Sequence, residues 1–197
     1  MKTDEKIALL AAGGAALIGG LWWWSEENDG ESIIDMVTDF IAELTTDEAE
    51  RMAQLEPETQ SRLRDLIFAL GADGMRVHVG ATLRTAAKEK ALIKAGRTSG
   101  TLVHSWHELG RAVDLYPIDP DTGKPDTAGR RLDLFIAMHA KAKAMGFRGI
   151  AFEADGVTRH YIKNSEGKLV WDGGHLECRG PYATMAQAWA AEGPSVA

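Results

Sequence analysis

The chain has 197 residues, of which 45% are hydrophobic and 26% are charged, so it has a globular composition and enough length for one sizeable core. This composition excludes collagen and low-complexity disorder, and a disulfide-stapled miniprotein is excluded because the single cysteine, Cys178, cannot form an internal disulfide. The net charge of -7 is uneven: residues 1–46 hold two of the 22 basic and nine of the 29 acidic residues, which leaves 20 of each sign downstream. A formally neutral remainder gives no electrostatic case for binding nucleic acid.

The first distinctive segment is the uncharged run IALLAAGGAALIGGLWWW, residues 7–24. Its 18 residues are just long enough to cross a bilayer as a helix, and the three tryptophans at its end favour the headgroup layer. We expect a retained membrane anchor or signal-arrest segment over residues 1–24, with the following chain on the periplasmic side. A cleaved signal peptide and a buried helix are the alternatives.

The next elements follow from capping and periodicity. Residues 25–46 are expected to form an acidic linker and a short amphipathic helix, IIDMVTDFIAEL, and residues 47–197 to form the main domain. A helix is expected to begin at Thr46, and another to run from Pro57 to Gly71. A strand, MRVHV, and a helix that ends at Gly96 complete this part.

The segment LVHSWHELGRAVDL, residues 102–115, has the densest chemistry. Residues 111–115 are expected to form a strand, with Ala112 and Asp114 on one face. An aspartate on the face of a strand that follows a histidine-bearing loop is poorly explained by packing. A carboxylate and an imidazole that converge there would suit zinc.

The remaining chain is expected to continue as mixed helix and strand. Residues 118–129 are expected to form a surface loop, because their acidic spacing lacks the register of a calcium-binding loop. A helix over residues 130–145 and a closing helix, YATMAQAWAAE, are expected to flank the domain. Three strands separated by turns are expected over residues 149–153, 157–164 and 169–177.

Two motifs together carry a family resemblance. SWHELGRAVDL matches SxHxxGxAxD and WDGGHLE supplies a later DxxHxE, in the order seen in zinc peptidases of the lysostaphin, D-Ala-D-Ala metallopeptidase and sonic hedgehog superfamily. The chain most resembles the L-alanyl-D-glutamate endopeptidase and D-alanyl-D-alanine carboxypeptidase branch, which includes phage endolysins. The likeness covers about residues 55–177. It implies an α+β fold, a small antiparallel sheet with flanking helices.

The resemblance implies that His107, Asp114 and His175 bind zinc. Asp172 occupies the general-base position three residues before the second histidine, with orientation of His175 as its alternative role. Glu177 is the second candidate for the base, because it projects from the same strand face as His175.

Arg84 matches the arginine that holds a substrate carboxylate or steadies the oxyanion, and Ser105 matches a position beside the site. Trp106 either lines the substrate cleft or fills the core. The chain departs from the family pattern before the arginine, where Thr82 and Leu83 replace the usual Gly-Tyr. The other histidines are expected to be structural or exposed; they are His78, His104, His139 and His160.

Two functions follow as hypotheses. The first is a zinc peptidase that cleaves peptidoglycan stem peptides. It would be a phage endolysin tethered to the membrane through residues 7–24, or a lysin associated with a virion. The second is a zinc-containing envelope-binding or structural protein that keeps the fold without catalysis. A carboxylate at Asp172 favours the enzyme, because a binding module has no need of one there.

Overall fold

The computed structural model describes residues 45–95, 104–164 and 166–193. The chain divides into two compact units, residues 1–49 and residues 50–197. Of the first unit, the structure describes the residues from Thr45 onward. The backbone N and the Oγ1 of Thr45 donate to Glu48 Oε2 at 3.0 and 2.9 Å. Glu48 N donates back to Thr45 Oγ1, and this capping box begins helix α4, Thr46–Ala53.

The second unit is built on an antiparallel sheet with the strand order β1-β2-β7-β4. A short strand, β3, pairs with the far end of β2. The bounds are β1 Val77–Val79, β2 Ala112–Asp119, β3 Lys124–Pro125, β4 Arg148–Gly149 and β7 His175–Glu177. In the register of β2 and β7, Asp114 lies opposite His175. Strands from distant parts of the sequence therefore bring these two side chains together.

Helices α5, Pro57–Ala72, and α7, Leu132–Ala144, pack against each other, and α7 also contacts β2 and β4. Pro57 stands at the start of α5, where Glu56 accepts a hydrogen bond from Thr59 N. The core contains fully buried side chains from both helices and from the sheet: Leu63, Leu66, Leu70, Phe135, Met138, Val113, Leu115 and Leu176. This apolar packing supports the strands from one side.

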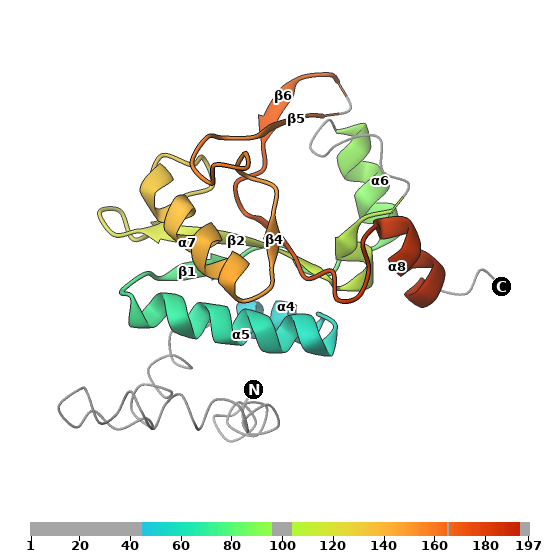
Figure 1. Ribbon diagram of the computed structural model, residues 1–197, viewed down its shortest axis with the longest axis horizontal. Coiled ribbons are helices and arrows are strands. Elements are labelled where there is room, and N and C mark those ends of the chain that lie inside the picture. Colours follow the sequence, from blue (N-terminus) through green and yellow to red (C-terminus); the bar gives the residue numbers. More distant parts are fainter. Residues whose placement is uncertain (1–44, 96–103, 165, 194–197) are drawn as a thin grey trace. The chain divides into compact units, whose positions relative to one another are not determined.

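The remaining elements are a hairpin, a 3-10 turn and two short helices. Figure 1 shows α5 along one side of the sheet, whereas α6 and the β5–β6 hairpin rise from the opposite side. The bounds are α6 Ala86–Lys94, η1 Trp106–Leu109, β5 Tyr161–Lys163, β6 Leu169–Trp171 and α8 Met185–Glu192. The expected mixed fold of helices and a small antiparallel sheet is confirmed.

The structure corrects three sequence expectations. The strand expected over residues 111–115 continues to Asp119, and the expected loop over 118–129 includes β3. Residues 169–177 do not form one strand, since β6 and β7 belong to different sheets.

Two glycines explain this break in the strand. A Cβ at Gly173 would lie 2.5 Å from the Trp171 ring, and one at Gly174 would lie 2.7 Å from the Tyr116 ring. Only glycine fits such a close approach of backbone to side chain. The turn at residues 172–174 thus separates the hairpin from β7.

Within the residues that the structure describes, no helix is both long and apolar enough to cross a membrane. The hydrophobic run at residues 7–24 and the helix expected over 33–44 lie outside the described residues.

Candidate metal centre

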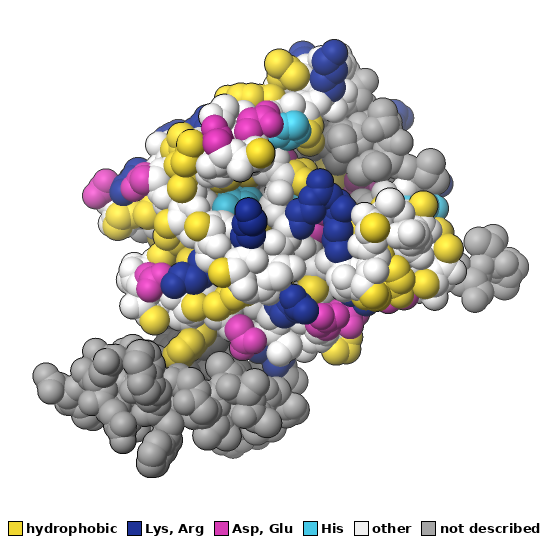
Figure 2. Space-filling view, in the orientation of Figure 1, with side chains coloured by type: hydrophobic (Ala, Val, Ile, Leu, Met, Phe, Trp, Pro, Cys, Tyr) yellow, Lys and Arg dark blue, Asp and Glu magenta, His cyan; other side chains and the backbone are white. Residues whose placement is uncertain are grey.

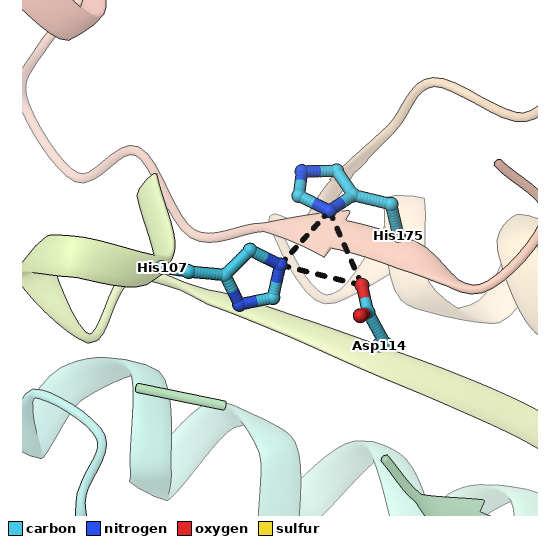
Figure 3. A group of neighbouring side chains, drawn as sticks. All are labelled: His107, Asp114 and His175. Carbon is cyan, nitrogen blue, oxygen red and sulfur yellow. Dashed lines mark hydrogen bonds and ion pairs between the residues drawn. The ribbon is translucent and has the colours of Figure 1, made fainter. Parts of the chain in front are cut away.

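Three elements supply one side chain each to a buried cluster. His107 comes from η1, Asp114 from β2 and His175 from β7, and at most 9% of any of the three residues is exposed. Figure 3 shows the three side chains pointing toward one another. Their potential ligand atoms all lie within 4.8 Å of one another, and among the described residues this is the group of histidine, cysteine and carboxylate side chains that could hold a metal ion.

The donor atoms form a nearly equilateral triangle. His107 Nε2 lies 3.2 Å from His175 Nδ1 and 3.3 Å from Asp114 Oδ1, and the third edge is 3.4 Å. A tetrahedron with bonds of about 2.0–2.1 Å, as zinc forms with nitrogen and oxygen, has edges of about 3.3–3.4 Å. The three donors therefore fit one face of a zinc tetrahedron, and the fourth corner is left for a water or a substrate.

Hydrogen bonds on the far side of each imidazole set its orientation. His107 Nδ1 lies 2.6 Å from the Thr82 carbonyl oxygen, to which it donates, so His107 Nε2 presents its lone pair to the cluster. His175 Nε2 lies 3.3 Å from Glu177 Oε1 and donates a hydrogen bond to this carboxylate. The lone pair of His175 Nδ1 is therefore presented to the cluster. Such outer partners are typical of histidines that bind metals.

The electrostatics of the cluster favour a positive charge. Burial raises the pKa of Asp114, but hydrogen bonds and charge from His107 and His175 outweigh burial and hold this pKa well below its usual range. Burial lowers the pKa of His175, but hydrogen bonds to Asp114 and Glu177 outweigh it and raise the pKa to about 10. An ionised buried carboxylate beside two imidazoles requires a cation, either a proton or a metal ion.

Asp172 lies in the turn before β7, separated from His175 by the two glycines. It forms no hydrogen bond or ion pair with the described part of the chain. Burial raises the pKa of Asp172, the charge of Asp114 raises it further, and the charges of His175, His107 and Arg84 lower it. Asp172 therefore interacts electrostatically with the cluster, and its carboxylate keeps its acceptor capacity.

Glu177 lies beyond the nitrogen of His175 that faces away from the cluster. Its Oε1 contacts His175 Nε2, whereas its Oε2 accepts a hydrogen bond of 2.7 Å from Arg179 Nε. Both carboxylate oxygens are engaged, and 7% of the side chain is exposed. This geometry suits a residue that orients His175 better than it suits a base that takes a proton from a substrate water.

Arg84 contacts the cluster through Asp114. Its Nη2 forms an ion pair with Asp114 Oδ2, the oxygen that is not part of the triangle, and its Nη1 lies 3.6 Å from Glu89 Oε2. The backbone N of Arg84 donates to the His107 carbonyl oxygen at 3.1 Å. The guanidinium is thus held beside Asp114, and its buried Nε has no hydrogen-bond partner among the described residues.

Ser105 and Trp106 differ in their surroundings. Ser105 is buried, and its hydroxyl oxygen has no hydrogen-bond partner among the described residues. Trp106 is 5% exposed and packs against Ala112 and Ala188 in a small apolar cluster, with Arg179 over its ring. Of the two roles considered for Trp106, burial favours the core over the substrate cleft.

Other histidines of the described chain lie outside the cluster. His139 Nε2 donates to the Gly173 carbonyl oxygen at 2.7 Å, and burial lowers the pKa of His139. His160 pairs with Glu153, and His104 stacks on Trp189 with ring centroids 3.5 Å apart.

The sequence analysis did not identify Arg179 or the Thr82 carbonyl as parts of the site. The role of a backbone carbonyl cannot be predicted from side-chain types. Arg179, however, lies two residues after Glu177, the spacing of side chains on one face of a strand.

No protein-family model and no curated protein matches the chain. The solved structures to which the chain is similar include three structures of peptidases. The L-Ala D-Glu endopeptidase ChiX of Serratia marcescens is 18% identical, with a TM-score of 0.47, over 68% of this chain and 87% of that chain. A mutant of the vancomycin-resistance D,D-pentapeptidase VanY from the VanB-type cassette, in complex with Zn(II), is 17% identical, with a TM-score of 0.44, over 70% and 78%.

The third structure is VanYB in complex with D-alanine-D-alanine. It is 20% identical, with a TM-score of 0.41, and the match covers 68% of this chain and 74% of that chain. The chemistry of the cluster rests on the donor geometry of this chain.

Replacement of any one triangle residue by alanine is expected to lower the zinc content. Because each residue supplies one of three protein ligands, His107→Ala, Asp114→Ala and His175→Ala leave only two donors. Zinc can be measured by atomic emission after gel filtration, with His160→Ala as the control because His160 is a half-exposed histidine outside the cluster. Full zinc occupancy in the His107→Ala protein would contradict the site.

Glu177→Gln is expected to weaken zinc binding about 10- to 100-fold, because the neutral amide orients and polarises His175 less well than a carboxylate does. Competition with a chromogenic chelator measures this affinity. Glu166→Gln is the matched control, since Glu166 lies exposed in the β5–β6 turn and pairs there with Lys168. Unchanged zinc affinity together with lost hydrolysis would instead make Glu177 a candidate base.

Proposed function

We propose that this protein is a zinc-dependent peptidase that hydrolyses stem peptides of peptidoglycan. The observation that carries the proposal is the triangle of two imidazoles and one carboxylate, with edges of 3.2–3.4 Å. A further carboxylate, Asp172, interacts with the charges of this triangle. Three protein ligands and an open fourth position are the arrangement of catalytic zinc sites, whereas structural zinc sites are closed by four. The choice of substrate rests on the resemblance of SxHxxGxAxD and DxxHxE to wall peptidases.

A zinc ion held by these ligands would supply Lewis-acid polarisation of the scissile carbonyl and a lowered pKa for a water molecule. Asp172 accepts the proton of the attacking water and later returns it to the leaving amine. Its raised pKa suits this task, because a base with a pKa nearer neutrality both takes up and releases the proton. With zinc bound, His107 and His175 would be neutral ligands, each giving its one remaining ring proton to an outer acceptor, and His175 would release the additional proton that its raised pKa favours in the absence of a metal.

Arg84 serves as the positive group beside the reacting carbonyl. Its guanidinium is anchored through Asp114 Oδ2 and lies close to Glu89, while its side chain is 14% exposed. A fixed cation at this position stabilises negative charge that develops on the carbonyl oxygen or holds a substrate carboxylate. The pairing with Asp114 also restrains the orientation of this carboxylate.

The bond that is cut is either the L-Ala-D-Glu bond or the terminal D-Ala-D-Ala bond of the stem peptide. The two activities differ in the products that they release. Mass spectrometry of purified peptidoglycan digested with and without chelator distinguishes them. Absence of any zinc-dependent product would favour the non-catalytic alternative, a zinc-containing envelope-binding protein.

Asp172→Asn is expected to keep its zinc and to lose about a hundredfold or more of the hydrolysis rate, because the amide has the same shape and cannot accept the proton. The measurement is kcat on a soluble muropeptide, together with zinc content. Asp155→Asn is the matched control, because Asp155 is an exposed aspartate that accepts hydrogen bonds from Val157 and Thr158 of its own loop. If Asp172→Asn stays active while zinc-loaded Glu177→Gln is dead, the base is Glu177.

We further propose that residues 7–24 hold the catalytic domain at the periplasmic face of the membrane, as in signal-arrest endolysins of phages. Support comes from the sequence alone: an uncharged run of 18 residues, lysines before it and three tryptophans at its end. A tether concentrates the enzyme near the cell wall. A formally neutral domain has no electrostatic attraction to the anionic envelope that could do the same.

Truncation before Ser32 is expected to give a soluble protein that keeps its zinc, because every proposed ligand lies downstream, and that cleaves soluble muropeptides at a comparable rate. Fractionation of cells that express each form measures the location. Lysis of intact cells from within is expected to fall in the truncated form. A full-length chain found wholly in the soluble fraction with its native N-terminus would rule out the anchor.

A further inference from the structure

The position of Asp172 depends on its neighbours in the chain, because its own carboxylate forms no hydrogen bond or ion pair with the described residues. The two residues that follow it, Gly173 and Gly174, have the most permissive backbone of any residue type. A general base has to lie within about 2.6–3.2 Å of the group whose proton it takes. Contacts from elsewhere in the fold must therefore hold the turn at residues 172–174.

Both glycine carbonyls of this turn accept hydrogen bonds. The Gly174 carbonyl oxygen accepts from the backbone N of Leu115 at 2.9 Å, which continues the pairing of β7 with β2. The Gly173 carbonyl oxygen accepts from His139 Nε2 at 2.7 Å. Gly173 is the residue next to Asp172, so the turn is tied to α7 by a side chain at the point closest to the proposed base.

His139 is itself held in a defined orientation. Its ring lies edge-to-face against Phe152, with centroids 5.2 Å apart, and the backbone of β4 packs so closely on it that a Cβ at Gly149 would collide with the imidazole. Burial lowers the pKa of His139, which favours the neutral ring. The single proton of that ring lies on Nε2, because a carbonyl oxygen can only accept. His139 is thus an oriented hydrogen-bond donor.

This contact is separate from the charged groups of the nearby surface. Figure 2 shows that basic and acidic side chains both occur around α7, without a region of one sign. Of the acidic groups there, Glu153 pairs with His160, with Oε1 and Nδ1 2.9 Å apart. His139 forms no hydrogen bond or ion pair with His107, Asp114 or His175. Its polar contact within the described chain is the one to the turn.

We propose that His139 is a positioning residue for Asp172: through the Gly173 carbonyl it holds the turn at residues 172–174, and with it the Asp172 carboxylate, beside the candidate metal centre. The role of Asp172 as the base rests on the proposed function, whereas the hold of His139 on the turn does not. Because His139 acts through Asp172, its loss lowers the rate of hydrolysis and leaves the metal ligands in place.

Three substitutions separate the hydrogen bond from the bulk of the ring. In His139→Gln the amide nitrogen reaches about as far as His139 Nε2 and donates in its place, whereas His139→Asn has a donor that ends too close to the backbone. His139→Leu fills similar space without a donor. Each of the three leaves the charge of the neutral ring unchanged.

Crystal structures of the zinc-loaded full-length wild type and variants test the hold on the turn without reference to activity. The turn is expected to stay in place in His139→Gln. In His139→Leu and His139→Asn the Gly173 carbonyl is expected to rotate and the Asp172 carboxylate to move by about 1 Å, a displacement sufficient to impair catalysis. An unmoved turn in His139→Leu would overturn the proposal.

Kinetics on a soluble muropeptide test the consequence. His139→Leu and His139→Asn are expected to lower kcat roughly 10- to 100-fold with zinc content and KM little changed, and His139→Gln is expected to restore kcat. In the Asp172→Asn background, His139→Leu is expected to lower the rate no further, because both changes act on the same step.

His160→Leu is the control, since His160 is a half-exposed histidine that pairs with Glu153. Equal losses from His139→Leu in the wild-type and Asp172→Asn backgrounds, or no recovery in His139→Gln, would make His139 a merely structural residue and overturn the proposal. A zinc-loaded wild type that hydrolyses no muropeptide, in which the turn nevertheless moves as expected, would overturn the proposed function instead. The hold of His139 on the turn would then stand.

Discussion

Three donor atoms held 3.2–3.4 Å apart in a buried place are the constraint on which the rest of the site depends. Two imidazole lone pairs and a carboxylate oxygen repel one another unless a positive charge lies among them. The fold holds them there because the pairing of β2 with β7 sets Asp114 opposite His175, and η1 adds His107. A proton can supply the charge, as the raised pKa of His175 indicates, and a zinc ion supplies it with the geometry that the triangle already has.

The surroundings of the triangle restrain each donor from behind. The Thr82 carbonyl fixes His107, Glu177 fixes His175 and Arg84 engages the second oxygen of Asp114. Arg179 extends this support, since it bonds Glu177, reaches the Ala183 carbonyl at 3.0 Å and covers Trp106. The candidate metal centre is thereby connected to the small apolar cluster of Trp106, Ala112 and Ala188, so that packing against α8 contributes to its order.

A good part of this could be predicted from the sequence. Helix caps and apolar periodicity predicted α4, α5, α7 and α8 to within a few residues, because those signals are local. The two motifs also named the three residues that the structure brings together. In contrast, residues 169–177 alternate like one strand, and their division into β6 and β7 depends on the approach of Trp171 and Tyr116 to two glycines. Contacts of this kind join distant parts of the chain, which periodicity does not report.

The same limit explains the site residues whose roles stayed open. Glu177 shares a strand face with His175, which is compatible with either a base or an orienting partner, and only the position of Arg179 and of His175 Nε2 favours the second. Trp106 stands between two residues of the first motif, yet it packs into the core, because η1 turns it toward α8.

X-ray absorption spectroscopy of the zinc-loaded full-length protein tests the central claim most directly, because it identifies the atoms bound to the metal. The triangle predicts four nitrogen or oxygen ligands at about 2.0–2.1 Å, with the outer-shell scattering of two imidazoles. A sulfur ligand at about 2.3 Å, which would implicate Cys178, or the scattering of three or more imidazoles would contradict a centre formed by His107, Asp114 and His175.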